Sequence, residues 1–245
     1  MAPQHPPLAI DTTFDFQTDA RGRDPDTFSP TLRHYHKLLW SKRLPGGTYF
    51  GLDDMTPGAY LHHRSSLGEY LLGSDSMIPT YTRWKRLMPL TTQFAASENE
   101  AFRILSYTIG GMILFPGNRV DGLATINGAR GCHPRIADRM DLTLECIRRY
   151  YSGDASPLYT TLNRYRAFFG LFEDFLGYVR YFLLDDLVYE TCSRVKFFLP
   201  FDGFSGSPLP RTVDEYKSYR SASMAFIELR NARIERYCTS GVVGE

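Results

Sequence analysis

The feature that most constrains the fold of this chain is an apolar repeat over residues 157–190. Large apolar side chains recur there at steps of three and four residues: Leu158, Leu162, Tyr165, Phe169, Phe172, Leu176, Val179, Leu183 and Leu187. This spacing places them on one face of an α-helix. A second row beside the first widens that face: Phe168, Leu171, Phe175, Tyr178 and Phe182. The sequence therefore predicts a long central helix over 157–190, packed by several other elements.

Weaker patterns elsewhere predict a small sheet and further helices. Helical spacing and capping signals predict helices over residues 30–41, 97–108, 137–151 and 212–237. Short apolar runs bounded by Gly and Pro predict two strands within 59–81, a strand at 109–115 that pairs with 123–127, and a buried strand at 195–201. Together these elements predict an α+β fold, in which a small, mostly antiparallel sheet packs on the central helix 157–190 and on the other helices.

Length and composition favour one globular domain over residues 11–240. The chain has 245 residues, of which 43% are hydrophobic and 14% aromatic, enough to bury a substantial core. Residues 1–10, MAPQHPPLAI, are rich in proline and lack both the basic start and the apolar run of a signal peptide. They are therefore expected to form a short disordered lead.

Cysteine spacing and hydropathy bear on the compartment. The four cysteines contain no C-x-x-C pair, which argues against a zinc ribbon or a dense disulfide scaffold: Cys132, Cys146, Cys192 and Cys238. Reduced thiols in a cytoplasm fit this pattern best. The longest uncharged stretch near the middle, residues 104–118, contains three glycines and a proline and falls short of the roughly 20 apolar residues of a membrane span. We therefore expect a soluble cytoplasmic protein with no membrane partner.

The charge balance limits long-range attraction to nucleic acids. Lys and Arg total 28 against 27 Asp and Glu, so the net charge is +1 and any such binding would need a local patch. Only five of the basic residues are Lys, which leaves 28 minus 5, or 23, as Arg. Arginine suits bidentate recognition of phosphate or carboxylate. Genomic base composition would produce the same bias, and both interpretations stay open.

A loop rich in Gly and Arg is the main candidate for a binding site. Residues 107–131 carry six of the 20 glycines. Polar side chains follow these glycines into the start of a predicted helix near residue 137, and they form the candidate ligand-binding set: Asn118, Arg119, Asn127, Arg130, Arg135 and Arg139. Exposed backbone N–H groups, a helix dipole and forked Arg donors together would bind an anion such as phosphate. The alternative is a pair of hairpin turns, at 116–117 and 127–128, with surface Arg–Asp pairs.

Two adjacent histidines are weaker candidates for catalysis. His62 and His63 fall in a predicted strand, where neighbouring side chains face opposite sides, so only one of them can serve a given site. That histidine could act as general base beside Glu69 or Asp75. The alternative is a half-buried strand histidine without a chemical role.

Other chemical signatures are absent from the sequence or incomplete. The sequence has no phosphate-binding P-loop, no G-x-S-x-G nucleophile elbow and no H-E-x-x-H zinc motif. His34 and His36 point apart on a predicted helix, which argues against a metal site there. Gly73-Ser74 is similar to the Gly-Ser turn of nucleotidyltransferases, but no D-x-D pair follows it to hold magnesium. No metal site is predicted, and no cofactor is indicated.

A family resemblance covers nearly the whole chain. It rests on the runs DTTFDFQTDARGRDPDTFSPTLRHYHKLLWSK, YTIGGMILFPGNRVDGLATINGARG, DRMDLTLECIRRYY and VKFFLPF. These runs resemble an uncharacterised bacterial protein family known only as a domain of unknown function. The resemblance implies a single bacterial, cytoplasmic domain, and it brings no activity, cofactor or catalytic residue.

Three functional hypotheses follow from the sequence. The first is a protein that binds a phosphate-bearing ligand, either a nucleotide or a nucleic-acid backbone, through the Gly/Arg-rich loop. The second is a hydrolase or transferase with a His/carboxylate pair. The third is an interaction module or homo-oligomer, in which surplus aromatic side chains on the long helix or the final helix contact a partner.

Overall fold

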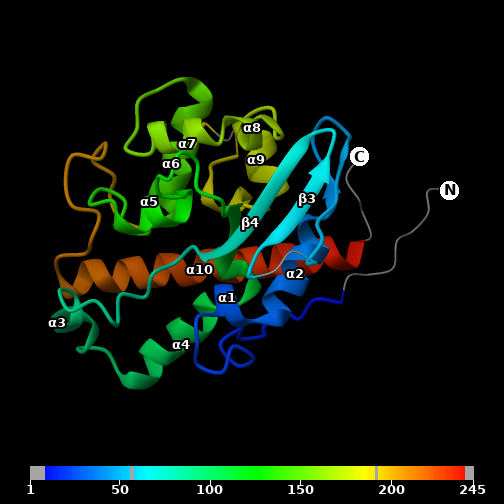
Figure 1. Cartoon of the computed structure of the whole chain (residues 1–245). Helices are drawn as coiled ribbons and strands as arrows, with labels where there is room; N and C mark the ends of the chain where they lie inside the picture. The colour runs from blue at the N-terminus through cyan, green and yellow to red at the C-terminus, as the bar shows by residue number, and fades with distance from the viewer. Residues whose placement is uncertain (1–8, 56–57, 191–192, 241–245) are drawn as a thin grey trace.

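The computed structural model describes residues 9–55, 58–190 and 193–240, and it has the predicted α+β fold (Figure 1). Residues 1–8 of the expected disordered lead, together with Cys192, lie outside this described part. Within it there are ten α-helices and five strands. No helix among these residues has both the length and the apolar character that a bilayer span requires.

The elements follow one another in a mixed order. The α-helices are α1 (Pro25–Phe28), α2 (Pro30–Trp40), α3 (Met88–Thr91), α4 (Ala96–Ser106), α5 (Ile126–Cys132), α6 (Met140–Ser152), α7 (Tyr159–Arg164), α8 (Arg166–Gly170), α9 (Phe175–Tyr181) and α10 (Val213–Ser240). The strands are β1 (Lys42–Arg43), β2 (Tyr49–Phe50), β3 (Leu61–Ser65), β4 (Gly68–Ser76) and β5 (Met112–Pro116). Two 3-10 turns complete the set, η1 (Ile109–Gly111) and η2 (Asp185–Leu187).

The main sheet is antiparallel, in the order β3-β4-β5, and β1 pairs with β2 in a separate hairpin. Leu72 in the central strand lies opposite Leu61 of β3 and Pro116 of β5. The two strands predicted within 59–81 are confirmed. The prediction that 123–127 pairs with 109–115 is wrong: the strand partner of β5 is β4, and the residues from Ile126 onward begin a helix that Thr125 caps.

The predicted long helix over 157–190 is wrong. The structure divides this segment into α7, α8, α9 and η2. The backbone of Glu173 has a positive φ of 66°, which ends the helical run, and the Asp174 carboxylate then caps a new helix by accepting from the Gly177 N–H at 2.7 Å. Leu183, with a φ of 52°, ends that helix. The apolar rows are buried by folding these short helices against each other: the rings of Phe172 and Tyr178 lie 5.3 Å apart.

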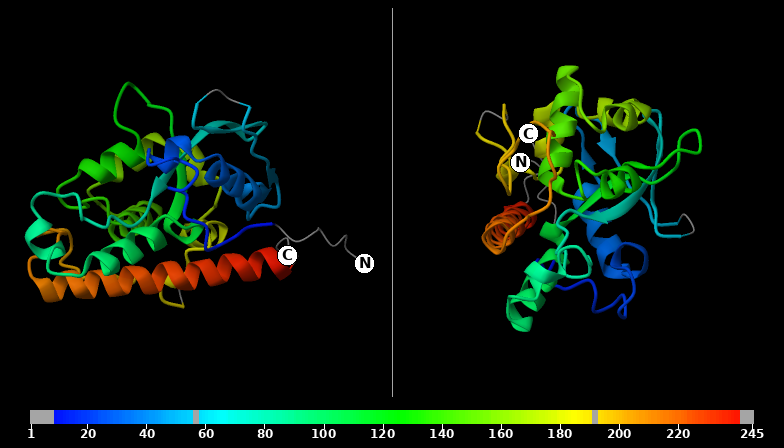
Figure 2. Two further views of the ribbon diagram at one scale, coloured as in Figure 1. Left: turned by 90° about the horizontal axis from the view of Figure 1, so that it is seen from below. Right: turned by 90° about the vertical axis from the view of Figure 1, so that its left-hand side faces the viewer.

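The long helix of this fold is α10, which the pattern over 212–237 predicts correctly. Figure 2 shows it running along one side of the molecule. It packs on α3, α4, η1 and η2. Arg230 at its centre is fully buried and donates hydrogen bonds to the carbonyls of Gly110, Met112 and Phe182, at 2.9, 2.8 and 2.9 Å. A Cβ at Gly110 would lie 2.5 Å from Asn231 Oδ1, so glycine is required for this close approach.

Two further predictions concern individual elements. The helix predicted at 30–41 is confirmed as α2: Ser29 is its N-cap, and its hydroxyl accepts from the Leu32 N–H at 3.0 Å. The buried strand predicted at 195–201 is wrong, and in its place Val195 makes an isolated bridge with Val188. The reason is that a side chain takes the place of a partner strand: the Phe198 N–H donates to the Asp141 carboxylate on α6 at 2.9 Å.

Candidate functional site

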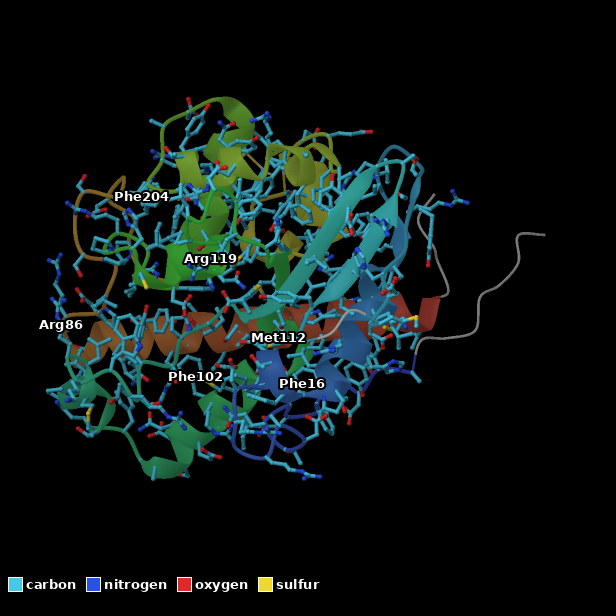
Figure 3. All side chains as sticks on the ribbon, viewed as in Figure 1. Phe16, Arg86, Phe102, Met112, Arg119 and Phe204 are labelled. Atoms are coloured by element: carbon cyan, nitrogen blue, oxygen red, sulfur yellow. The ribbon has the colours of Figure 1, made fainter. Side chains whose placement is uncertain are left out.

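A cavity of about 760 Å³ lies where α1, β4, the segment after β5 and the start of α5 meet. We call it the carboxyl cavity. Its charged and amide side chains are Asp24, Asp26, Asp75, Asn118, Arg119 and Asn127, and Ser74 also lines it. Four of these are candidates from the sequence, Asp75, Asn118, Arg119 and Asn127, and the fold brings them to one cavity. Arg119 is labelled in Figure 3.

A chain of hydrogen bonds leads from the core to this cavity. The Trp40 Nε1–H donates to His36 Nδ1 at 2.9 Å, so the proton of the neutral imidazole is on Nε2. His36 Nε2 lies 2.9 Å from Ser74 Oγ and therefore donates to it. Burial, reinforced by Arg230, lowers the pKa of His36 to about 3, so the ring stays neutral. His36 Nε2 therefore has no free lone pair with which to take a proton from Ser74, and the nearby Ser74 hydroxyl acts to lower the pKa of the Asp26 carboxyl group.

Asp26 is a buried carboxyl group in the cavity wall. Burial raises its pKa to about 8, and the nearby charges of Asp75 and Asp24 add to this effect, so Asp26 is mostly protonated at neutral pH. Its Oδ1 atom is buried and meets no hydrogen-bond partner within the described structure. Such an atom costs about 1–3 kcal/mol unless a bound molecule satisfies it.

Asn127 presents a second atom of this kind. Its Nδ2 donates to the Ser74 carbonyl at 3.3 Å, while its Oδ1 is buried and has no partner among the residues described. Two buried oxygens without a partner in the described structure therefore belong to side chains that line one cavity, and a ligand that carries hydrogen-bond donors would satisfy them.

Asp75 is held by a buried arginine. The Arg130 guanidinium lies 2.5 Å from Asp75 Oδ2 and 2.8 Å from Asp138 Oδ1, and its Nε donates to Thr143 Oγ1 at 3.1 Å. Burial raises the pKa of Asp75 to about 6 against the opposing effect of Arg130. Asp75 is therefore mostly ionised at neutral pH, whereas Asp26 is mostly protonated.

The four candidate arginines have different environments. Arg130 is fully buried in the ion pairs just described. Arg135 donates to the carbonyls of Ser205 and Gly206, and Arg139 donates to Asp141 at 3.0 Å. These two line a second, smaller cavity of about 180 Å³ against residues 199–211. Arg119 is exposed and, within the described part of the chain, makes no hydrogen bond or ion pair, so it is the arginine available to a ligand.

Glycines of the Gly/Arg-rich segment have packing and helical roles in the structure. A Cβ at Gly117 would lie 2.2 Å from the ring of Tyr60, so glycine allows that ring to form a wall of the carboxyl cavity. The hairpin turn considered at 127–128 is wrong, because both residues lie in α5. Thr125 caps this helix, and its hydroxyl accepts from the Gly128 N–H at 3.2 Å.

The histidine candidates lie on β3 and face opposite sides, as strand alternation predicts. His62 Nε2 lies 2.9 Å from Glu69 Oε1 across the β3–β4 pair, on a partly exposed face. His63 is buried, stacks on Phe50 at 3.9 Å between ring centroids, and hydrogen-bonds the Gly51 carbonyl through Nδ1 at 2.8 Å. None of these residues lines the carboxyl cavity, so the His62–Glu69 pair is separate from Asp75.

Sequence reasoning passed over Asp26, and it considered His36 only as a metal ligand and Ser74 only in a magnesium-dependent turn. The available signal was a D-x-D pattern, Asp24-Pro25-Asp26. It lies far upstream of Gly73-Ser74 rather than after it, and only the packing of α1 on β4 brings the two together.

Comparison with known sequences places this arrangement in a family. A family of unknown function, DUF6994, has a model that matches residues 10–234. The chain belongs to DUF6994. The match includes every residue that lines the carboxyl cavity, so the cavity is part of the DUF6994 domain. No curated protein and no solved structure matches the chain.

Proposed function

We propose that this DUF6994 protein binds a phosphate-bearing small molecule, of the size of a mononucleotide, in the carboxyl cavity. The observation that carries the proposal is the position of Arg119, an arginine without an internal partner among the described residues, in the wall of a cavity with two buried, unsatisfied oxygens. A volume of about 760 Å³ lies within the range of small-molecule sites.

The charged and the uncharged side chains of the cavity would contact different parts of such a ligand. Arg119 offers the forked donors that suit a phosphate group. Asp26 is mostly protonated and Asp75 is offset by Arg130, so the inner wall repels an anionic ligand only weakly. Asp26 and Asn127 would then contact an uncharged polar part of the ligand, such as a nucleobase or a sugar.

The same charges favour a mononucleotide over a nucleic-acid strand. A strand carries a phosphate at every nucleotide, and its binding depends on several cations that follow the backbone. Arg119 is the single arginine in the wall of the carboxyl cavity, and Asp24 and Asp75 line the same cavity. This wall therefore suits a ligand with one phosphate group.

Calorimetric titration at low salt tests the proposal. The four 5′-ribonucleoside monophosphates and inorganic phosphate are titrated into the wild-type protein, the Arg119→Ala variant and the Arg86→Ala variant. Arg86 is an exposed arginine that does not line the cavity, which makes it the matched control (Figure 3). We expect binding of at least one nucleotide, a loss of about tenfold or more in affinity for Arg119→Ala, and no change for Arg86→Ala. Absence of nucleotide binding, or equal affinities in all three proteins, would overturn the proposal.

The interaction-module hypothesis is a separate proposal with its own test. Many of the aromatic rings of 157–190 are buried within this chain, including Phe168, Phe169, Phe172 and Tyr178. Light scattering compares the mass in solution with the 28.0 kDa of one chain. A doubled mass would favour a homo-oligomer, and a mass of one chain would count against it.

A further inference from the structure

We propose that the second cavity, the one of about 180 Å³ beside Arg135 and Arg139, binds a free α-amino acid with an apolar side chain. We call it the loop cavity, because residues 199–211 form most of its wall. The carboxylate of the ligand would lie at Arg211 and its ammonium group at Asp202. This inference goes beyond the nucleotide proposed for the carboxyl cavity and does not depend on it, since the two cavities share no lining residue.

The charges of the loop cavity favour a ligand that carries both signs. Arg139 is already paired with the buried Asp141, at 3.0 Å. Two cations and two anions that line the cavity form no ion pair among the described residues: Arg135, Arg211, Asp202 and Glu215. A ligand with a single charge would contact groups of its own sign in this set, whereas a zwitterion offers an opposite charge to both kinds.

Arg211 and Asp202 approach the same point of the loop. A Cβ at Gly206 would lie 2.5 Å from Asp202 Oδ2 and 3.4 Å from Arg211 Nη2, so both polar ends lie on the side of Gly206 where a side chain would be. The two ends are close, yet the described structure has no ion pair between them. The carboxylate and the ammonium group of an α-amino acid are attached to one carbon atom, so one ligand can contact both ends at once.

Hydrogen bonds to the backbone hold these groups in position before a ligand binds. Asp202 Oδ1 accepts from the Ser205 N–H at 3.0 Å, and Oδ2 accepts from the Gly206 N–H at 2.5 Å. Arg135 donates to the Gly206 carbonyl at 2.9 Å and is therefore a positioning residue for the loop. The Arg211 guanidinium makes no hydrogen bond within the described part of the chain, so it is available to a carboxylate. A site fixed in this way loses little conformational entropy on binding.

The inner part of the loop cavity is apolar. Asp202 and Arg211 are exposed, whereas Leu142 of α6 and Leu199 are buried, so the charges lie towards solvent and the apolar side chains lie inside. The half-buried Phe204 also lines the cavity, and its φ of 68° is uncommon for a bulky residue (Figure 3). An amino acid held by its charged groups would thus place its own side chain against these apolar residues.

The volume sets the size of the ligand. The loop cavity, at about 180 Å³, is smaller than the roughly 300–1,000 Å³ of sites that take drug-sized molecules. The carboxyl cavity, at about 760 Å³, lies within that range. The loop cavity therefore suits a molecule such as leucine rather than a nucleotide.

Calorimetric titration of the wild-type protein with matched ligands tests the inference. L-Leucine is the probe. N-Acetyl-L-leucine lacks its ammonium charge, L-leucine methyl ester lacks its carboxylate charge, and glycine lacks its apolar side chain. We expect L-leucine to bind and each of the three analogues to bind about tenfold or more weakly. The acetylated ligand tests the role of Asp202 without altering the loop that this residue holds.

A variant locates the binding in the loop cavity. Arg211→Ala removes the guanidinium that would hold the carboxylate, and we expect it to lower the affinity for L-leucine about tenfold or more. Arg86→Ala is the matched control, because Arg86 is an exposed arginine that lines neither cavity. Circular dichroism of both variants checks that they are folded.

The contrary outcomes are separate from those of the nucleotide proposal. Absence of L-leucine binding, or equal affinities in Arg211→Ala and wild type, would overturn the inference. Equal binding of N-acetyl-L-leucine and L-leucine would also overturn it, because the cavity would then recognise an anion and not a zwitterion. None of these results bears on nucleotide binding in the carboxyl cavity, and a failure of nucleotide binding leaves the amino-acid site standing.

Discussion

The indole N–H of Trp40 donates a hydrogen bond of 2.9 Å to Nδ1 of His36, one turn earlier on α2. Because an indole nitrogen can only donate, this bond fixes the tautomer of the imidazole. It follows that His36 Nε2 donates its proton to the Ser74 hydroxyl. A core contact between two residues of one helix thereby determines which imidazole nitrogen donates to Ser74, a residue that lines the carboxyl cavity.

His36 makes stability fall in acid. Its pKa is about 3 in the folded protein and near 6.5 when exposed. Below about pH 6.5 the unfolded chain therefore binds a proton at this histidine that the folded protein does not bind. Stability is therefore lost as the pH falls from about 6.5 towards 3. We expect His36→Gln to lose less unfolding free energy than wild type between pH 7 and 4.5, by roughly 1–3 kcal/mol. Urea unfolding at both pH values measures this, with His34→Gln, an exposed histidine on the same helix, as the control. Parallel losses in His36→Gln and wild type would contradict the prediction.

Asp26 has the opposite dependence on pH. Its pKa is about 8 in the folded protein against 3.8 when exposed, so between these values the unfolded chain releases a proton that the folded protein keeps. Its contribution to stability therefore falls as the pH rises towards 8. Asp26→Asn lacks this ionisation, and we expect its stability relative to wild type to be higher at pH 8 than at pH 5 by roughly 1–3 kcal/mol. Urea unfolding of Asp26→Asn and wild type at both pH values provides the comparison. Asp154→Asn is the control, because Asp154 is an exposed carboxylate that does not line the cavity. A constant difference across pH would show that Asp26 titrates normally.

Local signals predicted the elements that local interactions determine. The Ser29 cap and the spacing after it predicted α2, and the pattern over 212–237 predicted α10. The break in 157–190 was not predicted, because an apolar period of three and four residues is the same in one long helix and in short helices that fold back on each other. The turn depends on Glu173 and Asp174, two acidic residues within an otherwise regular pattern.

The site was predicted in part for a similar reason. Asn118, Arg119 and Asn127 were named from one loop, and Asp75 from a strand. Asp26 was not named, because its raised pKa arises from burial against β4, a contact between distant parts of the chain. Sequence composition also could not distinguish Arg119, which is exposed, from Arg130, which is wholly buried.

The contrast between these two arginines gives a third prediction. Arg130→Met would leave Asp75 and Asp138 without their shared cation, and removal of one partner from a buried ion pair costs about 3–5 kcal/mol. Arg119→Ala removes no internal contact among the described residues, so its stability should stay within about 0.5 kcal/mol of wild type. Chemical unfolding of both variants measures the difference. Similar stabilities for Arg130→Met and Arg119→Ala would mean that the Arg130 cluster does not stabilise the fold.

The contact between Gly117 and Tyr60 gives the last prediction. A Cβ at Gly117 would lie 2.2 Å from the Tyr60 ring, so Gly117→Ala must displace the ring or shift the strand end, at a cost of roughly 1–3 kcal/mol. In Gly117→Ala/Tyr60→Ala the ring is gone. We therefore expect the double variant to lose less unfolding free energy than the sum of the losses in Gly117→Ala and Tyr60→Ala, with a coupling energy of about 1 kcal/mol or more.

Gly128→Ala is the matched control for Gly117→Ala, because its Cβ would meet neighbouring atoms only at 3.6 Å and it lies inside α5. It should stabilise the protein by about 0.5–1 kcal/mol, since alanine favours the helix interior. Urea unfolding of wild type, Gly117→Ala, Tyr60→Ala and the double variant measures the cycle, and Gly128→Ala is unfolded in parallel. Additive costs in the double variant would show that Tyr60 does not rest on Gly117, and the wall of the carboxyl cavity would then have a different position.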